Sequence, residues 1–169
     1  MADFDPAFER MMDIEDPDRK GKVTYDTGKT TRWGISSRAF PEVNVAILTL
    51  PEARSLYRIH YWNQISGDSI KSQAVANELF EAAVNCGVGT AIRFAQRAYN
   101  VLRVTGEPIL VDGWIGDKTR AALNDLSRRY ESALVAAMNG EQYRYYATLV
   151  ETDPEQFASS IRGWMRRVR

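Results

Sequence analysis

The sequence predicts a mainly helical, all-α fold with one small β-hairpin near its N-terminus. Apolar side chains recur at helical spacing in the first 15 residues. The chain beyond residue 72 consists almost entirely of helix-forming segments punctuated by caps and breaks. Residues 23–25 favour a strand instead, and the turn sequence 26–29 follows them. We therefore expect seven or eight helices and at most one hairpin, without internal repeats or low-complexity segments.

The first helix is expected to open at Asp5 and Pro6, because Asp favours the N-cap and Pro the first helical position. Its end is expected before Pro17, since a residue that precedes proline avoids the helical conformation. One face of this helix is apolar along its length and finishes on Glu15. The apolar members of that face are Phe4, Phe8, Met11 and Met12.

Glu15 is an acid at the end of an apolar helix face, beside an open loop. Burial disfavours the ionised form of a carboxyl group, and a general acid working near neutral pH has to stay protonated. The alternative is that the side chain is solvated or paired with an arginine, because carboxylates are seldom buried alone. The helix pattern by itself leaves both roles open for Glu15.

Capping signals predict the other helices. Thr49 and Glu52 form a capping box, Gly87 ends the helix that precedes it, and Thr90 and Asp117 are expected caps. The last ten residues hold four arginines and no acid, which suits the C-terminal end of a helix dipole. The helices are expected at 36–40, 49–61, 72–85, 90–103 and 117–169, the last broken at 139–140 and 152–154.

Composition restricts the class of protein. At 169 residues and 44% hydrophobic content, the chain suits one domain, or one domain with a small appended lobe. The 22 basic and 22 acidic residues cancel, so no net field attracts nucleic acid. The single cysteine, Cys86, excludes an internal disulfide framework, and the lone His60 without a cysteine cluster predicts no metal site. We expect no cofactor.

The N-terminus has no basic region followed by an apolar one, so no secretory signal is expected. No apolar run reaches transmembrane length, and no stable membrane insertion is predicted. We therefore expect synthesis in the cytoplasm and a separate route for any export.

Two short glycine-containing motifs follow the first helix along the chain, one at residues 26–35 and one at residues 112–119. With the helix that ends at Glu15, they resemble glycoside hydrolase family 108. This lysozyme-like muramidase family occurs in bacteria and phages, and some members are labelled secretion activators. Residues 26–35 keep the Asp, first Gly, Thr, aromatic, Gly and Ile of the family signature, and residues 112–119 resemble its C-terminal peptidoglycan-binding-type segment. Further matches are Glu52-Ala53, Tyr61-Trp62, Leu79-Phe80, Asn85, Gly87, Gln96, Phe157 and Arg162-Gly163-Trp164.

The resemblance implies hydrolysis of the β-1,4 bond between N-acetylmuramic acid and N-acetylglucosamine in bacterial peptidoglycan. It implies Glu15 as the general acid, Asp26 as the second carboxylate and Thr31 as the group that holds a water molecule or a sugar. Asp26 suits the first position of a turn equally well. The alternative is a core role for Tyr61 and Trp62 and a structural turn for the loop of Trp114. The substrate-binding candidates are Tyr25, Trp33, Tyr61, Trp62, Glu81, Asn85 and Trp114.

The chain departs from the family around the proposed site. Asp16 and Pro17 replace the two glycines after the catalytic Glu, and Lys29 replaces the second glycine of the hairpin signature. Five basic residues beside the site form either a rim that attracts peptidoglycan carboxylates or an ordinary solvated loop. These residues are Arg19, Lys20, Lys22, Lys29 and Arg32.

The leading hypothesis is a phage or prophage muramidase of endolysin type, which reaches the cell wall after release. The alternative is a catalytically weakened peptidoglycan-binding or secretion-associated protein on the same fold. A third is a helical adaptor without affinity for the wall. We expect a catalytic region at 1–105 and a helical peptidoglycan-binding-type segment at 106–169, packed into the same globular unit. The oligomeric state and the stereochemical outcome are left open.

Overall fold

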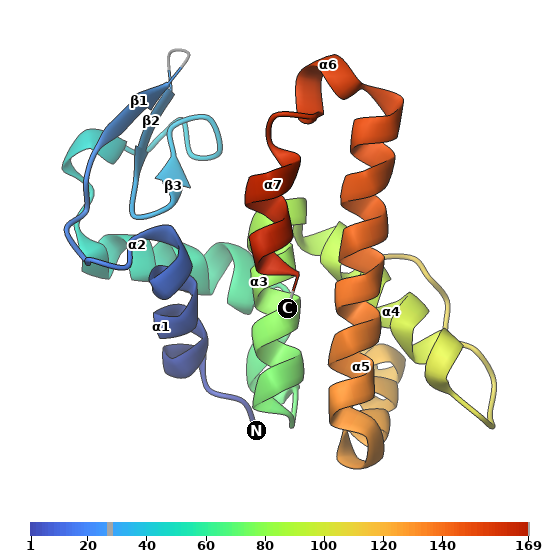
Figure 1. Ribbon diagram of the computed structural model, residues 1–169. Helices are drawn as coiled ribbons and strands as arrows, with labels where there is room; N and C mark the ends of the chain where they lie inside the picture. Colours follow the sequence, from blue (N-terminus) through green and yellow to red (C-terminus); the bar gives the residue numbers. More distant parts are fainter. Residues whose placement is uncertain (27–28, 169) are drawn as a thin grey trace.

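The computed structural model describes residues 1–26 and 29–168. Helices pack around a common core, and a small antiparallel sheet lies at one edge (Figure 1). Within the described ranges there are seven α-helices and three short strands. The predicted mainly helical fold is therefore confirmed, and the sheet has one strand more than the predicted hairpin.

Helix α1 (Phe4–Glu15) ends where the sequence predicts, and Asp16 is its C-cap. Its N-cap is Asp3 rather than Asp5, because the Asp3 side chain accepts the backbone N–H of Asp5. The apolar face is buried as expected. This burial fixes the direction of α1 and therefore the place of Glu15.

The predicted hairpin is formed by β1 (Thr24–Asp26) and β2 (Lys29–Arg32), which are antiparallel. The middle of its turn, residues 27–28, lies outside the described residues. A third strand, β3 (Ile35–Ser36), pairs with the other edge of β2. The expected helix at 36–40 is therefore wrong. The backbone of Ser36 pairs in the sheet, and a turn follows it.

The capping box is confirmed, with both reciprocal hydrogen bonds between Thr49 and Glu52. It opens α2 (Leu50–Tyr57), which continues as the π-helical turn η2 (Arg58–Trp62). Two 3₁₀ turns, η1 (Val45–Ile47) and η3 (Gly67–Ser69), flank this unit.

Helix α3 (Gln73–Cys86) stops at Gly87, whose φ is +87°, as predicted. Helix α4 (Val88–Leu102) starts directly after it, so Thr90 lies inside the first turn and does not cap. Gly116 is the N-cap of α5 (Asp117–Thr152), and Asp117 is its first helical residue. Both cap assignments made from sequence are therefore displaced by one or more residues.

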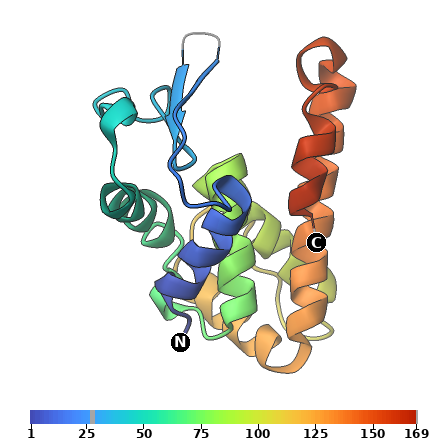
Figure 2. The same ribbon diagram turned by 60° about the vertical axis from the view of Figure 1, so that its left-hand side comes forward.

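Helix α5 runs through residues 139–140, where a break was expected, and its non-helical residue is Tyr130 instead. Asn139 is buried and donates its side-chain amide to the Val135 carbonyl, while Gly140 is exposed. Packing thus overrides the weak helix propensity of this pair. The break at Asp153 is confirmed, and its side chain caps α6 (Pro154–Phe157). The chain then returns along α5 through α7 (Ile161–Trp164) and η4 (Met165–Arg167) (Figures 1 and 2).

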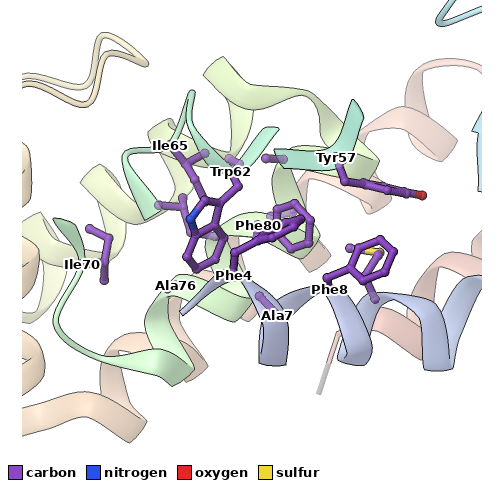
Figure 3. Close-up of a cluster of buried hydrophobic side chains, with 14 of the residues drawn as sticks. Phe4, Ala7, Phe8, Tyr57, Trp62, Ile65, Ile70, Ala76 and Phe80 are labelled. Carbon is purple, nitrogen blue, oxygen red and sulfur yellow. The ribbon is translucent and has the colours of Figure 1, made fainter. Parts of the chain in front are cut away.

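The core beneath α1 is rich in aromatic side chains. Phe4, Phe8, Tyr57, Trp62 and Phe80 converge from α1, α2, η2 and α3 (Figure 3). Burial of a large apolar side chain contributes about 1.5–3 kcal/mol, so this cluster anchors α1 firmly.

None of the described helices has the length and apolar character that a membrane span requires.

Candidate active site

A cleft of about 320 Å³ lies between the end of α1, the loop after it and the sheet. It brings Glu15 and Thr31 to one place, as the sequence predicted for these two residues. Its lining is completed by Asp16, Pro17, Asp18, Lys22, Thr24, Arg32, Trp33 and Gly34.

Glu15 is the last residue of α1, and its side chain is 19% exposed. Gly34, with φ +74°, approaches it so closely that a Cβ there would lie 2.9 Å from Glu15 Cγ and 2.4 Å from the Tyr57 hydroxyl. The Tyr57 hydroxyl donates to the Trp33 carbonyl at 3.1 Å. Burial raises the pKa of Tyr57 well above its ordinary value, so this donor stays protonated. The carboxyl group is thus packed on one side by the sheet turn.

The other neighbour of Glu15 comes from the opposite end of the chain. Arg167 Nη2 donates to Glu15 Oε1 at 2.7 Å, across 152 residues of sequence. The Asn85 amide, turned with its oxygen toward the guanidinium, accepts from Nη1 and Nε at 3.0 and 3.1 Å. The arginine partner that the sequence allowed for Glu15 is therefore present, and it is Arg167.

The loop after α1 is held in place by its own polar groups. Asp16 Oδ2 accepts the backbone N–H of Gly21 at 2.6 Å. Arg19 turns away from the cleft and pairs with Glu9 and Asp13 at 3.0 and 2.8 Å. Of the five predicted rim cations, only two, Lys22 and Arg32, line the cleft.

The hairpin contributes threonines rather than a carboxylate to the lining. Thr24 is directly opposite Thr31 in the register of β1 and β2, and both line the cleft. Asp26 is exposed, pairs in register with Lys29 near the hairpin turn and is not among the lining residues. Tyr25 is 75% exposed and also lies outside the lining. The lining of the cleft therefore includes Glu15 but not Asp26, and the predicted pairing of these two carboxyl groups stays a prediction.

Trp33 lines the cleft, but its ring is largely structural. The side chain is 8% exposed, and Nε1 donates to the Leu48 carbonyl at 2.9 Å. The ring also covers Gly21 so tightly that a Cβ there would lie 2.2 Å from it. Little of either ring face is left for a sugar.

Two predicted substrate-binding residues, Trp62 and Glu81, lie in the core and not at a binding surface. Trp62 is 0% exposed and donates Nε1–H to Asp68 at 2.7 Å, so its ring cannot stack on a sugar (Figure 3). Glu81 is 3% exposed and lies 3.7 Å from Arg10. Tyr61 is half-buried against Phe40. The run of aromatic residues and the family resemblance pointed to these side chains without showing which of them reach the surface.

The exposed tryptophan of the C-terminal part lies over a second hollow, of about 990 Å³. Trp114 is 75% exposed. Its loop is held by Gln96, which donates to Asp112 Oδ1 at 2.8 Å and accepts the Gly113 N–H at 2.9 Å. Asp112 also accepts the N–H of Trp114 itself. The loop is therefore a structured turn that presents an aromatic ring to solvent.

Sequence patterns do not reveal Thr24 or Arg167 as parts of the site. The signature 26–35 includes Gly34, but it does not show that Gly34 contacts Glu15 and Tyr57. Thr24 could have been found from the hairpin register, since it faces Thr31. Arg167 gave only a generic signal, the excess of arginine at the C-terminus. Its contact with Glu15 depends on the tertiary fold.

The site thus consists of a carboxyl group at the end of a helix, above a cleft beside a small sheet. Residues 19–87 match the family model described as Glycosyl hydrolase 108, and residues 90–169 match the one described as Predicted Peptidoglycan domain. The two matches support a peptidoglycan-related glycosyl hydrolase family for this chain, with a glycosyl hydrolase 108 region followed by a peptidoglycan domain. The proposed division at residue 105 stays a prediction.

The fold is similar to the solved structure of SagA from Brucella abortus, with a TM-score of 0.72. The match covers 97% of this chain and 90% of that chain, at 24% sequence identity. At this identity the likeness supports the fold alone. A comparison with curated proteins gave no match.

Proposed function

We propose that the protein is a peptidoglycan hydrolase of muramidase type, which cleaves the β-1,4 bond between N-acetylmuramic acid and N-acetylglucosamine with Glu15 as its general acid. The observation that carries the proposal is the position of Glu15, which lines a cleft at the end of α1 with its side chain 19% exposed. The family match supports the substrate class.

In the proposed reaction, Glu15 transfers a proton to the glycosidic oxygen while the bond from that oxygen to the anomeric carbon breaks. Water then adds to the anomeric carbon and releases a proton to a base. One fragment thereby gains a hydroxyl group at its anomeric carbon, and the other gains a hydrogen on the former glycosidic oxygen. The facing hydroxyl groups of Thr24 and Thr31 are suited to hold this water, because a hydroxyl both donates and accepts hydrogen bonds.

A second carboxylate usually directs the water or stabilises the positively charged transition state. We assign this role to Asp18, because it lines the cleft and its side chain is 71% exposed. Asp16 lines the cleft too, but its Oδ2 accepts the backbone N–H of Gly21 at 2.6 Å. Asp18 Oδ2 accepts from the exposed side chain of Lys20 at 3.2 Å, a contact that a bound substrate can displace more easily than a backbone hydrogen bond. Asp26, the candidate from sequence, is outside the lining.

Binding of the wall polymer is proposed at two places. Lys22 and Arg32 line the cleft and would attract the carboxylates of the lactyl peptides. Trp114 offers an exposed ring for stacking on a sugar in the C-terminal domain. The enzyme would act on the cell wall after release or export by a route that another protein provides.

A second candidate function is peptidoglycan binding with weakened turnover. The ion pair between Glu15 and Arg167 favours it, since this contact occupies one oxygen of the carboxyl group in the absence of substrate. The replacement of two family glycines by Asp16 and Pro17 points the same way.

The test is the release of reducing ends from purified sacculi, measured for the native chain and for Glu15→Gln. Glutamine keeps the size and hydrogen bonding of the side chain but has no acid proton to donate. Glu42→Gln, at an exposed acid outside the cleft, is the matched control. We expect release by the native chain and the control and a loss of at least about 10²-fold in Glu15→Gln. Equal release by all three would place the acid elsewhere, and binding without release would favour the second candidate.

A further inference from the structure

The C-terminal segment is packed against α5 by aromatic contacts before it reaches the cleft. Trp164 of α7 stacks on Tyr146 of α5, with ring centroids 5.1 Å apart and an interplanar angle of 30°. The Tyr146 hydroxyl is in turn bonded to Gln142 at 2.8 Å. Figures 1 and 2 both show this segment returning along α5. Arg167 therefore reaches Glu15 from a supported backbone.

The guanidinium of Arg167 is fixed from two sides. Asn85, near the end of α3, accepts from Nη1 and Nε, and Glu15, at the end of α1, accepts from Nη2. The Arg167 side chain is only 16% exposed. A planar guanidinium held by several directed hydrogen bonds keeps a fixed orientation, which a flexible ammonium group would not.

The two oxygens of Glu15 are in different situations. Oε1 accepts the hydrogen bond from Arg167 at 2.7 Å. Oε2 has no hydrogen-bond donor among the residues that the structure describes, and Glu15 lines the cleft. One oxygen is thus held, and the other is available to a ligand.

We propose that Arg167 is a positioning residue for Glu15, so that the C-terminal peptidoglycan domain completes the active site of the glycosyl hydrolase region. This inference rests on the proposed function. The guanidinium holds the carboxyl group by Oε1 so that Oε2 faces the glycosidic oxygen. It also stabilises the carboxylate that forms when Glu15 gives up its proton.

Two simpler roles for the contact make different predictions. A purely structural tie between the two ends of the chain would lower stability when it is removed, without a selective effect on turnover. A latch that blocks Glu15 would raise turnover when it is removed. A positioning role lowers the turnover number and changes KM little, because ground-state binding does not need the proton transfer geometry.

The experiment measures initial rates on soluble glycan fragments of peptidoglycan, over a range of concentrations, for the native chain, Arg167→Gln and Arg167→Lys. Arg162→Gln removes the same charge from an exposed position of the same segment and is the matched control. Thermal unfolding of each variant shows whether it is folded. We expect kcat to fall by about 10²-fold in Arg167→Gln, the scale of a misplaced reacting group, with KM within about threefold. Arg167→Lys keeps the charge and should retain more turnover than Arg167→Gln, while the control matches the native chain.

Unchanged or increased kcat in folded Arg167→Gln would overturn the inference and leave the proposed function standing. Equal losses in the Gln and Lys variants would support positioning by the planar guanidinium and would overturn the part of the inference in which its charge stabilises the carboxylate. If Arg167→Gln does not fold, the Lys variant decides. A folded Arg167→Lys with native kcat and KM would overturn the inference. A native chain that releases no product would instead overturn the proposed function itself, and this inference with it.

Discussion

Glu78 is a buried acid of α3 whose ionisation should make the stability of the protein depend on pH. It is 2% exposed, and burial raises its pKa from an ordinary 4.5 to about 7, with a further contribution from the neighbouring Glu81. Arg10 and a hydrogen bond with Asn139 act in the opposite direction. The folded protein therefore holds a proton on Glu78 over a pH range in which the unfolded chain has released it.

The sign of the effect follows from this difference. Below the unfolded pKa of 4.5 both states are protonated at Glu78, and the group has no net effect on the free energy of unfolding. Between pH 4.5 and about 7 the unfolded chain gains the favourable ionised form first, so stability falls. Above about 7 the loss is complete. It amounts to about 3 kcal/mol, at about 1.4 kcal/mol per pH unit.

The assay is urea unfolding at pH 5 and at pH 8 for the native chain and for Glu78→Gln, which has a neutral side chain at both values. We expect the stability of the variant relative to the native chain to increase by about 2–3 kcal/mol from pH 5 to pH 8. At pH 5 the native chain has lost only a small part of the stability that the ionisation of Glu78 removes. Other titrating groups affect both proteins alike and cancel in the comparison. Stabilities that change in parallel between the two pH values would refute the reasoning.

Four further predictions use urea unfolding and assays on purified sacculi. Gly34→Ala should lower the free energy of unfolding by at least about 1–2 kcal/mol, because it places a side chain at positive φ. It should also abolish turnover by displacing Glu15, and native stability would contradict this prediction. Trp62→Ala should cost about 3–5 kcal/mol in urea unfolding, and a loss under 1 kcal/mol would contradict its core position. Trp114→Ala should leave stability within about 0.5 kcal/mol and weaken sedimentation with sacculi, whereas unchanged sedimentation would remove the ring from the binding surface. Release of reducing ends should fall as salt rises from low ionic strength, because screening weakens the attraction of Lys22 and Arg32 for the wall, and a flat salt profile would exclude that attraction.

Local features of the chain were predictable because their causes are local. The end of α1 at Glu15 follows from Pro17, and the start of α2 follows from the capping box at Thr49. The hairpin follows from its strand and turn residues. These features depend on interactions within a few residues, which a sequence pattern records directly.

Features that depend on packing were not predictable in the same way. The contact between Glu15 and Arg167 joins residues 152 positions apart, and no spacing rule applies over that distance. Helix α5 passes through Asn139 because its neighbours bury that side chain, although the local sequence favours a break. An aromatic residue such as Trp62 suits a sugar-binding surface and a core equally well until the fold decides which.

The measurement that tests the central claim most directly is the identity of the ends that the native chain creates. Purified sacculi are digested in water labelled with ¹⁸O, the products are reduced with borohydride, and mass spectrometry identifies the reduced sugar. A muramidase that adds water at the anomeric carbon predicts reduced N-acetylmuramic acid with one ¹⁸O atom per new end. Reduced N-acetylglucosamine, an anhydro end without the label, or cleavage confined to the peptides would contradict the account.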